Sequence, residues 1–512
     1  RQFGGFLSEY THGEYRFLAH SVEQYFANGG TRCFVSRVIP EDAKTAKTDT
    51  GILSIEAASP GKWGNRIQIN LTTALRRKMQ LIARAGERSY VAKTADGFKE
   101  GDILVFENEY NRIETIYDET VTFEKEFSED VVDESVIPSK VLFLANFDMQ
   151  VRYNDDVENY QDLSLNRDAR NYIGARLAGS EIIKLEVVRD VEAMNPVYQL
   201  LGEDVESGMI TLAGGTDGSM DKVTAGTFIG EDRGPGKRTG IQAFLENQAV
   251  SIMAVPGVTM PEVEVALVAH CELTKSRFAI LDMPENMYKT NELIQYRSMI
   301  DSTYAAMYHP WIQVFDRAAN KPGFVPPSGA VAGIYSRTDI SRGVHKAPAN
   351  EVVFCTGLEF NYTKEEQDIL NPENVNLIRA LPGQGIRVWG ARTASSNSAF
   401  RYVNVRRLFI FVEESIRMNT NWVVFEPNDQ TLWQRVQITI TGFLDSLWRN
   451  GMLAGASPDE AFFVEIGTST MSRDDIMNGR LICNIGIAPS RPAEFVIFRV
   501  TQNTSEAGGG GE

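Results

Sequence analysis

The sequence has no closely spaced cysteines, no long apolar run and no secretory pattern at its start. A disulfide scaffold or a structural zinc site needs cysteines close together in the sequence, as in a Cys-x-x-Cys pair, and the chain has no such pair. Reduced, buried thiols are therefore expected. No stretch approaches the run of roughly 20 apolar residues that a membrane helix requires, so direct membrane insertion is not expected. The four cysteines are Cys33, Cys271, Cys355 and Cys483.

Lysine is missing from the last part of the chain. No lysine follows Lys364, yet the stretch from Asn371 to Ser505 holds thirteen arginines and twelve acidic residues. Lysine is the common solvating cation, whereas arginine is favoured in buried ion pairs and at interfaces. This part of the chain is therefore predicted to meet partner molecules, with a chance bias in composition as the alternative.

Basic residues are outnumbered overall, and the formal net charge is −17. The excess is concentrated between Asp96 and Glu134, where fourteen acidic residues stand against three basic ones. Phosphate backbones need a basic face, so no nucleic-acid partner is expected. Like charges are best tolerated in solvent, which predicts that this acidic segment faces outward.

The chain is too long, at 512 residues and 57.1 kDa, for one ordinary core. Changes in periodicity along it predict an α/β multidomain protein. A mixed N-terminal part is followed by an inserted β-rich domain, a central α/β domain, and an α+β C-terminal domain that ends in a β-arm and a glycine-rich tail. The expected borders are 1–60, 61–200, 201–359, 360–488 and 489–512.

Particular elements are predicted in the first two parts. Ser21–Asn28 has a short helical pattern, and Arg32–Ile39 alternates like a strand. Short strand patterns in the inserted domain occur at Arg66–Leu71, Ile103–Phe106 and Val141–Leu144.

The central part alternates apolar runs with helical patterns. Short apolar strands separated by helices imply a parallel sheet that is covered on both faces. The strands are predicted at Met209–Leu212, Ser251–Val255, Phe278–Leu281 and Trp311–Phe315, with a helix that begins at Pro261.

The C-terminal domain has clear helix signals. One helical pattern runs from about Val403 to Met418. A second is capped by Asn428 and Asp429 and ends at Gly451. Residues Ser457–Glu460 predict a capping box with proline at the first helical position.

Two segments are similar to catalytic motifs without completing them. Residues 234–239 match part of the P-loop motif, which binds phosphate. However, Glu231 occupies the position of its first glycine, and Arg238 occupies the position of its serine or threonine. Gly467–Met471 is similar to the serine segment of subtilisin-type proteases, but no histidine occurs in a matching context. A polar loop and a turn are the preferred interpretations.

His270 and Cys271 are adjacent and could suggest a metal or nucleophile pair. Neighbouring residues on a helix point about 100° apart, so the two side chains would not converge on one ion. No catalytic residue, no cofactor and no metal ligand is predicted from the sequence.

A series of segments, in order along the whole chain, resembles the tail sheath proteins of contractile bacteriophages and related injection systems. The most specific is Gly343-Val344-His345-Lys346-Ala347-Pro348 together with the long run at 385–393. The other segments are 26–30, 59–65, 214–218, 239–241, 255–257, 310–311, 326–329, 332–334, 406–408, 425–429 and 492–495.

The resemblance implies a structural protein that polymerises helically, as stacked rings around an inner tube, and contracts to drive that tube through a target cell envelope. The implied partners are further copies of the chain, the inner tube protein, a baseplate, and a cap or terminator protein. It implies a central domain similar in topology to subtilisin but without the triad. The implied location is a virion tail or phage-tail-like particle, assembled in the bacterial cytoplasm.

One departure from the family pattern concerns the start of the chain. Family members usually begin with an extended arm that contains a Pro-Gly-Val-Tyr-like segment, whereas this sequence begins at Arg1 within what resembles the globular part. A native start is therefore expected to be missing, and the arm is either absent from this sequence or lost in this member of the family. The alternative function is a hydrolase or nucleotide-binding enzyme that uses the central α/β domain, and a convergent catalytic constellation would distinguish it.

Two sets of residues are predicted to connect subunits. An alternating strand with two apolar faces can add to a neighbour's sheet, with an ordinary internal strand as the alternative. Its residues are Glu494, Phe495, Val496, Ile497, Phe498, Arg499, Val500 and Thr501. Three arginines on the first C-terminal helical pattern are predicted to face the inner tube or a neighbouring subunit: Arg406, Arg407 and Arg417.

Overall fold

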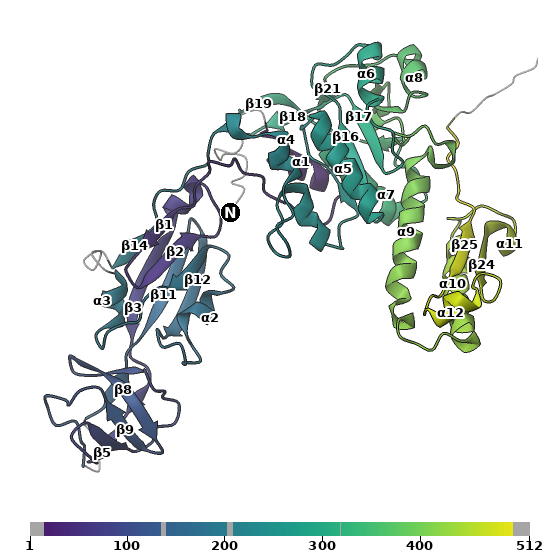
Figure 1. The fold of residues 1–512 in the computed structure, drawn as a ribbon. Coiled ribbons are helices and arrows are strands. Elements are labelled where there is room, and N and C mark those ends of the chain that lie inside the picture. The colour runs from purple at the N-terminus through teal and green to yellow at the C-terminus, as the bar shows by residue number, and fades with distance from the viewer. Residues whose placement is uncertain (1–14, 135–139, 202–207, 318, 495–512) are drawn as a thin grey trace, which may run out of the picture. The chain divides into compact units, whose positions relative to one another are not determined.

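The computed structural model describes residues 15–134, 140–201, 208–317 and 319–494 (Figure 1). These residues form two compact units. Unit 1 comprises Ile39–Thr227, and unit 2 combines the residues before and after that segment. Unit 1 is therefore inserted into the chain of unit 2.

Unit 2 contains a six-stranded sheet in the order β15-β16-β17-β22-β23-β20, of which the first four strands are parallel and the last two antiparallel. The strands are β15 (Ile252–Met253), β16 (Phe278–Asp282), β17 (Ala305–His309), β22 (Val375–Leu381), β23 (Gly385–Val388) and β20 (Glu351–Val352). The principal helices are α1 (Leu18–Ala27), α5 (Pro261–Thr274), α6 (Thr290–Arg297), α7 (Ser328–Arg342), α8 (Lys364–Leu370), α9 (Val403–Asn419), α10 (Gln430–Arg449), α11 (Pro458–Ala461) and α12 (Arg473–Met477).

The predicted parallel sheet with both faces covered is confirmed. Every residue of β16 and β17 is buried, which explains their lack of polar alternation. Phe278 packs against Tyr335 of α7, whereas its strand neighbour Leu281 lies against Val263 of α5. Helices thus cover the sheet from both sides, and the helix predicted from Pro261 begins there.

Glycines allow α1 to pack closely on α7. A Cβ atom on Gly329 would lie 2.4 Å from the carbonyl oxygen of Ser21, and one on Gly333 would lie 2.3 Å from that of Tyr25. Larger residues at these two positions would force the helices apart. The predicted helix at Ser21–Asn28 is therefore present, and it joins the N-terminal residues to unit 2.

One strand that the sequence predicted for the central parallel sheet belongs to a different sheet. The strand predicted at Trp311–Phe315 is β18 (Ile312–Asp316), which pairs antiparallel with β19 (Lys321–Val325) and β21 (Gly357–Leu358). Its expected place in the parallel sheet is taken by β17. The sequence of β17, Ala-Ala-Met-Tyr-His, lacks the β-branched run by which strands are recognised.

The central sheet also crosses an expected domain border. β22 pairs in parallel with β17, and β23 pairs with β22. The border expected between residues 359 and 360 therefore falls inside one structural body, because both strands follow it in the sequence.

The C-terminal part consists of α9, α10 and a β-hairpin of β24 (Phe462–Ile466) and β25 (Cys483–Ile487). The helices predicted from Val403 and from Asp429 are confirmed, and the Asp429 side chain accepts a hydrogen bond of 2.9 Å from the amide of Leu432. The predicted capping box at Ser457 is wrong. The Ser457 hydroxyl accepts no hydrogen bond from the helix, and the Glu460 carboxylate accepts from the amide of Ala456 and not from that of Ser457.

Unit 1 contains two sheets that share one core, with orders β12-β11-β3-β14 and β1-β2-β13. Their strands and two short helices are β1 (Lys47–Asp49), β2 (Leu53–Ala57), β3 (Gln68–Ala74), β11 (Asn146–Tyr153), β12 (Asp156–Leu163), β13 (Ile183–Val187), β14 (Met209–Thr211), α2 (Ile173–Leu177) and α3 (Pro196–Leu201).

The expected borders of the β-rich part need correction. β1 and β2 precede residue 61 but pair with each other and with β13, and β14 follows residue 200 but pairs antiparallel with β3. The strand predicted at Met209–Leu212 therefore belongs to unit 1 and not to the parallel sheet. No strand is assigned to Arg32–Ile39.

A closed barrel lies within unit 1, between β3 and β11. Its strand order is β4-β10-β7-β8-β9-β6-β5, and only Gln80 separates the two terminal strands of that order, so the sheet closes on itself. It has its own apolar core. The strands are β4 (Lys78–Met79), β5 (Leu81–Arg84), β6 (Ser89–Ala92), β7 (Ile103–Phe106), β8 (Glu109–Tyr117), β9 (Thr120–Phe123) and β10 (Leu142–Leu144).

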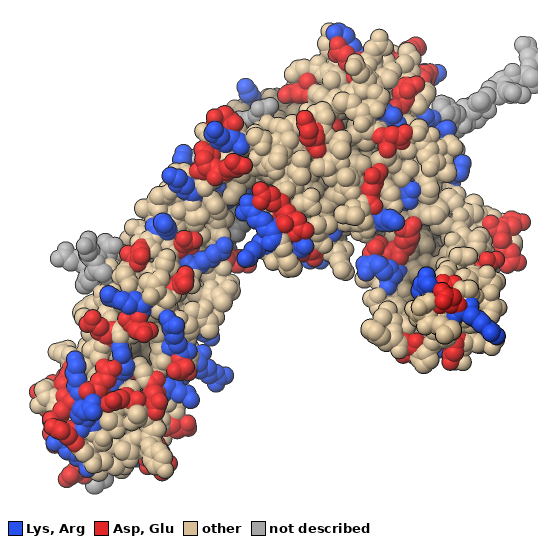
Figure 2. Space-filling model, in the orientation of Figure 1, with Lys and Arg blue, Asp and Glu red and all other residues tan. Residues whose placement is uncertain are grey.

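The acidic segment 96–134 forms much of this barrel, and several of its carboxylates have basic partners. Glu114 pairs with Arg88 at 3.0 Å, and Glu124 pairs with Arg112 at 3.1 Å. On the face seen in Figure 2, red and blue side chains are interspersed over the barrel. The local charge excess is therefore partly balanced by neighbouring arginines.

Two further expectations concern thiols and membranes. All four cysteines are free, but Cys33 is exposed, so the expectation that every thiol is buried is wrong. Across the described stretches of the chain, no helix has both the length and the apolar character needed to cross a bilayer.

Removing the barrel is expected to leave the rest of unit 1 folded. Ala74 and Asn146 are paired neighbours on β3 and β11, so an Asn-Gly turn replacing residues 75–145 would turn them into an ordinary hairpin. Cooperative thermal melting by circular dichroism and resistance to limited proteolysis should persist. Deleting 61–200 is the contrasting control, because it removes β13 and leaves β2 without that partner. Aggregation of the 75–145 deletion would contradict this assignment.

Candidate functional site

The first residue of the predicted linking strand is held by its own chain. The Glu494 carboxylate accepts hydrogen bonds from Arg392 Nε at 2.8 Å and Arg392 Nη2 at 2.7 Å. It also accepts from Asn371 Nδ2 at 2.6 Å and from the Tyr402 hydroxyl at 3.0 Å. Both carboxylate oxygens are thus satisfied by a guanidinium fork and two neutral donors.

Arg392 is itself positioned by a buried amide. Asn376 of β22 accepts from the Arg392 amide at 2.7 Å and donates to the Arg392 carbonyl at 2.8 Å. The same Nδ2 donates to the carbonyl of Met307 on β17 at 3.0 Å. Asn376 is fully buried, so these bonds fix the Arg392 backbone to the central sheet.

The local electrostatics favour an ionised Glu494. Burial raises the pKa of its carboxyl, but hydrogen bonds from Arg392 and Asn371 outweigh burial and leave the pKa below its ordinary value. The Arg392 side chain is 7% exposed and that of Glu494 is 17% exposed. The pair is therefore charged and largely shielded from water.

The chain reaches this point along a fixed path. Pro489 forms an isolated bridge with Leu453, and the Ser490 carbonyl accepts from Asn404 Nδ2 at 3.2 Å. Residues 491–494 form no strand. A strand donated to another copy would pair only in the assembly, so the linking strand from Glu494 to Thr501 stays a prediction, and residues 495–501 lie outside the described residues.

Arg406 of α9 faces its own chain. Its guanidinium lies over the rings of Phe400, at 3.6 Å from the centroid, and Tyr304, at 4.4 Å. Its Nε donates to Thr303 Oγ1 at 3.0 Å. Arg406 is 8% exposed, so these internal contacts account for most of its surface.

Arg407 also faces inward, where it joins α9 to α7. It binds the Asp339 carboxylate in a fork with distances of 2.9 and 2.5 Å, and it lies 4.8 Å from the ring centroid of Tyr335. The Tyr335 hydroxyl is hydrogen-bonded to that of Tyr308 at 2.7 Å. This buried network attaches α9 to the central sheet.

Arg417, the third predicted interface arginine, lies near the end of α9 and is about half exposed. Its guanidinium contacts Glu414 of the same helix at 2.6 Å. An exposed pair within one helix is weak, so Arg417 remains available to a partner. The structure thus brings Arg406 and Arg407 into the body and leaves Arg417 at its surface.

The hairpin of β24 and β25 has room for further strands. In the described part of the chain, neither strand pairs with a third one. Val464 and Ile485 belong to the core that includes α10, whereas Phe463 is 54% exposed. Main-chain groups on an unpaired edge are the groups to which an added strand binds.

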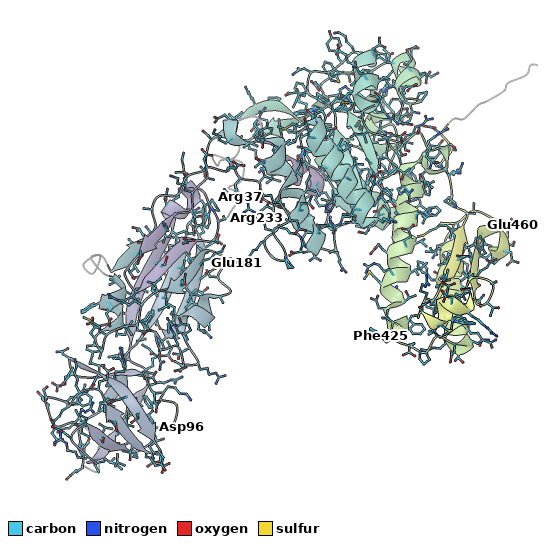
Figure 3. The ribbon with its side chains drawn as sticks, in the orientation of Figure 1. Arg37, Asp96, Glu181, Arg233, Phe425 and Glu460 are labelled. Atoms are coloured by element: carbon cyan, nitrogen blue, oxygen red, sulfur yellow. The ribbon has the colours of Figure 1, made fainter. Side chains whose placement is uncertain are left out.

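An exposed aromatic side chain lies in the connection between α9 and α10. Phe425 is fully exposed and has a left-handed backbone with φ of 70°, and Figure 3 shows it at the end of the helices, away from the body. Its neighbour Val424 is 64% exposed. Sequence patterns did not identify this apolar tip, because an exposed phenylalanine resembles a buried one in the sequence.

The catalytic-like segments have structural roles. In the loop 234–239, the Gly236 amide donates to the Glu246 carboxylate at 2.7 Å, and Arg238 binds the same carboxylate. An internal anion thus takes the place that a phosphate would need. Thr470 donates to the carbonyl of Ile482 at 2.7 Å, as expected for a turn.

His270 and Cys271 do not form a metal pair. His270 is bonded to Arg277, and Cys271 is fully buried. Within the described residues, no group of three or more His, Cys, Asp or Glu side chains is placed to hold a metal ion.

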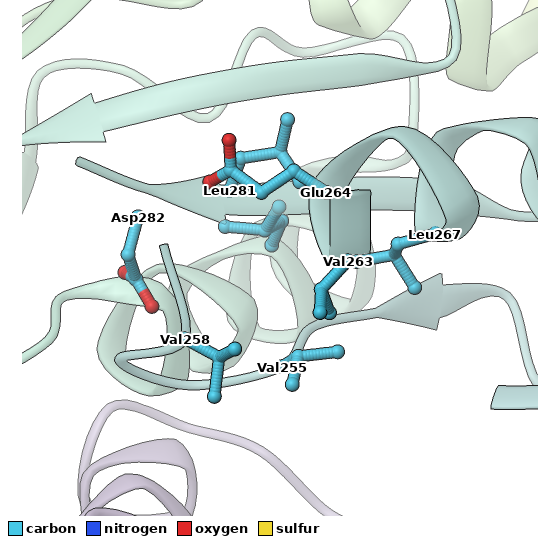
Figure 4. A pocket seen from close by; sticks show the side chains of 8 residues that line it. Val255, Val258, Val263, Glu264, Leu267, Leu281 and Asp282 are labelled. Carbon is cyan, nitrogen blue, oxygen red and sulfur yellow. The ribbon is translucent and has the colours of Figure 1, made fainter. Parts of the chain in front are cut away.

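Two buried carboxylates were missed by the sequence analysis. Asp282, at the end of β16, accepts from the Ser328 amide at 2.8 Å and from the Gly257 amide at 3.1 Å. Glu264 of α5 lines the same small pocket, where Val255, Val258, Val263, Leu267, Ile280 and Leu281 form the apolar wall (Figure 4). Acidic residues usually indicate a surface, so only the fold reveals these two.

Burial dominates the electrostatics of this pocket. It raises the pKa of Glu264 to about 8 and that of Asp282 to about 6. Glu264 accepts one hydrogen bond, from the Tyr296 hydroxyl at 2.9 Å, whereas Asp282 also accepts from the Ser328 hydroxyl. Asp282 accepts more hydrogen bonds than Glu264, and the rise in its pKa is correspondingly smaller.

Two protein-family models match adjoining parts of the chain. The model of the phage tail sheath protein central domain matches residues 233–394, and that of the phage tail sheath C-terminal domain matches residues 395–503. Together they cover more than half of the chain. The border between them follows β23, in agreement with the extent of the central sheet.

Individual relatives have similar descriptions. A prophage major tail sheath protein of Pseudomonas aeruginosa is 29% identical over 290 residues, which are 54% of this chain and 72% of the relative. Among solved structures, the contracted sheath of the extracellular contractile injection system PVC is 38% identical over 47% of this chain and 68% of that one, with a TM-score of 0.44. The contracted anti-feeding prophage sheath is 35% identical over 51% and 72%, with a TM-score of 0.45.

The raised pKa of Glu264 gives a pH dependence of stability. An acid whose pKa is higher in the folded state loses stability as pH rises from its unfolded pKa, near 4.5, to its folded pKa, near 8. Between pH 6.5 and 8 this loss should be about 1–2 kcal/mol. The pKa values of His270 and His309 are lowered from 6.5 to about 4 and 3 in the fold, so their titration in the unfolded state adds a smaller gain of stability that opposes this loss and is common to wild type and variants.

Urea unfolding of the full chain at pH 6.5 and 8 measures this loss. The variant Glu264→Gln keeps the shape and removes the titration, so its change in stability between the two pH values should be about 1–2 kcal/mol more favourable than that of wild type. Glu262→Gln, at an exposed position of the same helix, should retain the wild-type slope. Equal slopes for the two variants would contradict the assignment.

Proposed function

Because this chain belongs to the phage tail sheath protein family, we propose that it assembles into a helical sleeve around an inner tube. It is a structural subunit of a contractile sheath, as its relatives are. In this proposal the sleeve is docked on a baseplate and closed by a cap or terminator protein. A trigger at the baseplate lets it shorten and widen, which drives the tube through a target envelope.

Contraction of this kind requires two packings of nearly rigid bodies, with the long form metastable. It also requires links between subunits that persist while the packing changes. Two observations carry the proposal: the chain is held at Glu494, directly before the predicted linking segment, and neither strand of the β24–β25 hairpin has a third partner among the described residues. The arm and the acceptor lie on the same chain, so each copy can serve both neighbours.

We assign the link to residues Phe495–Thr501, added as a strand to β24 or β25 of a neighbouring copy. Val496, Phe498 and Val500 alternate with Phe495 and Ile497, so a strand here would have two apolar faces. Six main-chain hydrogen bonds at about 1 kcal/mol each, with burial of the side chains, give a link of several kcal/mol. Such a link can persist during rearrangement, since strand pairing is local to the arm.

Unit 1 lies outside this linking machinery. Its sheets and its barrel have their own cores, and the linking residues all belong to unit 2. We propose that the barrel faces outward from the sleeve. Its remaining acidic excess would then face solvent, where like charge is best tolerated.

We propose that the protein acts without catalysis of its own and binds no nucleic acid. The enzyme alternative needs a nucleophile whose proton a nearby histidine can accept. His309, for example, is hydrogen-bonded to the hydroxyl of Tyr362 and not to a serine or cysteine. ATP or peptide hydrolysis by the pure protein, lost in Lys237→Ala or Ser469→Ala, would support the enzyme instead. The likeness of the central domain to subtilisin remains a prediction.

Its place in the cell follows from the family. Relatives are components of phage tails or phage-tail-like particles. We propose the same particle for this chain, assembled in the bacterial cytoplasm, where its four free thiols would remain reduced.

Truncation tests the proposed link. A chain that ends at Glu494 keeps the contacts of the described residues, so it should remain folded and melt cooperatively. It should not form tubes, because the donated strand is gone. Electron microscopy of the purified protein and analytical ultracentrifugation measure the difference from the full chain.

A point variant provides the matched comparison. Phe498→Asp keeps the backbone able to pair, but a buried carboxylate without a partner costs several kcal/mol. It should be folded and assembly-deficient, whereas removal of the glycine tail after Ala507 should change nothing. Normal tubes from the chain that ends at Glu494 would refute strand donation.

Arg417 is the predicted interface arginine that remains available, and we propose that it pairs with a carboxylate of a neighbouring copy or of the inner tube. Arg417→Ala should weaken assembly at low salt and matter less at high salt, because exposed ion pairs are screened. Arg449→Ala is the control, since Arg449 is also an exposed helical arginine with a partner in its own helix. Identical assembly thresholds for the two variants over a salt series would rule out this role.

A further inference from the structure

The last described residue, Glu494, is held in an electrostatic clamp by Arg392, Asn371 and Tyr402. Between the end of β25 at Ile487 and Glu494, the chain contains Pro489 and Pro492, which cannot donate to a strand ladder. The strand predicted for residues 495–501 is therefore separated from β25 of its own chain. Its starting point is defined by the Glu494 carboxylate.

We propose that Glu494 is the anchor residue that fixes the root of the C-terminal arm to the central sheet and transmits the pull of a neighbouring subunit into that sheet. This inference rests on the proposed function, since it requires that the arm be held by another copy. Glu494 is here a positioning residue and not a member of the donated strand.

The geometry of the clamp suits the transmission of force. A carboxylate held by a guanidinium fork resists rotation as well as extension, because two parallel hydrogen bonds fix its plane. Arg392 is bound through its backbone to Asn376, whose amide also binds Met307. A pull on the arm therefore reaches β22 and β17 through hydrogen-bonded groups, with no flexible segment between.

Loss of the clamp would introduce slack. The next contacts toward the body are those of Ser490, whose carbonyl accepts from Asn404 and whose amide donates to Met452. Release of Glu494 would free residues 491–494, which can span about 13 Å when extended. A link that is longer by this amount would let neighbouring subunits settle at many distances.

The contacts differ from an ordinary attachment of a chain end. Apolar packing alone would hold the segment without setting its direction, whereas the four donor–acceptor contacts to Glu494 are directional. Both ions are shielded, and such a pair is retained where position matters more than stability.

The test uses the full chain with Glu494→Gln, which keeps the side-chain shape and removes the charge. Tyr402→Phe removes one of the contacts and is the milder variant. Glu426→Gln removes a carboxylate from an exposed loop of the same unit and is the matched control. Three measurements are made on each: the melting temperature, hydrogen exchange of the Ala488 and Ser490 amides, which donate to Ala461 and Met452, and electron microscopy of the tubes.

For Glu494→Gln we expect cooperative melting at a temperature lowered by a few degrees, since the shielded Arg392 loses its counter-ion, together with exchange at these amides that is about tenfold faster. Tubes should form but be short and variable in their axial repeat. Tyr402→Phe should be intermediate, and Glu426→Gln should match wild type in all three measurements.

Wild-type exchange or regular tubes of Glu494→Gln would overturn the anchor while leaving strand donation intact. Failure of Glu494→Gln to fold would overturn it too, because the contact would then support the fold and not the position of the arm. If the wild-type chain forms no tubes, the proposed function fails, and the exchange data still decide whether Glu494 holds the root.

Discussion

The buried amide of Asn376 is the contact on which the arrangement of the C-terminal half depends. Its nitrogen binds the carbonyls of Met307 and Arg392, and its oxygen binds the Arg392 amide. A strand 69 residues earlier in the sequence and a segment 16 residues later thus meet at this one side chain. Leaving such a buried amide unpaired is costly, so β17, β22 and the Arg392 segment are held in a single arrangement.

That arrangement determines what can remain rigid when a sheath rearranges. Arg407 and Asp339 attach α9 to α7, and Arg392 attaches the root of the arm to β22. Helix, sheet and arm root thus belong to one body. The barrel, in contrast, is inserted between two paired strands of unit 1 and has a core of its own.

Sequence periodicity identified the elements whose signals are local, such as an apolar face or a helix cap. The helices from Pro261, Val403 and Asp429 were predicted because their apolar faces and caps are local. β17 was not, because its burial depends on two other strands: Ala305 and Ala306 pair with β16, and the residues after them pair with β22, more than sixty residues away in the sequence. Strand pairing of this kind is decided by tertiary contacts and not by local propensity.

The site was predicted in part for the same reason. The excess of arginine indicated where ion pairs would form, but not whether a partner would be internal or external, and Arg406 and Arg407 proved to be internal. Glu494 was interpreted as a strand residue because alternation alone cannot show that a carboxylate faces Arg392. Glu264 and Asp282 gave no signal at all, since burial of an acid depends on the whole fold.

The central claim is that copies of the chain are linked by donated C-terminal strands, and a helical reconstruction of the assembled protein by electron cryo-microscopy tests it most directly. The account expects residues 495–501 to continue from Glu494 as a strand hydrogen-bonded to β24 or β25 of an adjacent copy. Pairing of that segment within its own chain would contradict it.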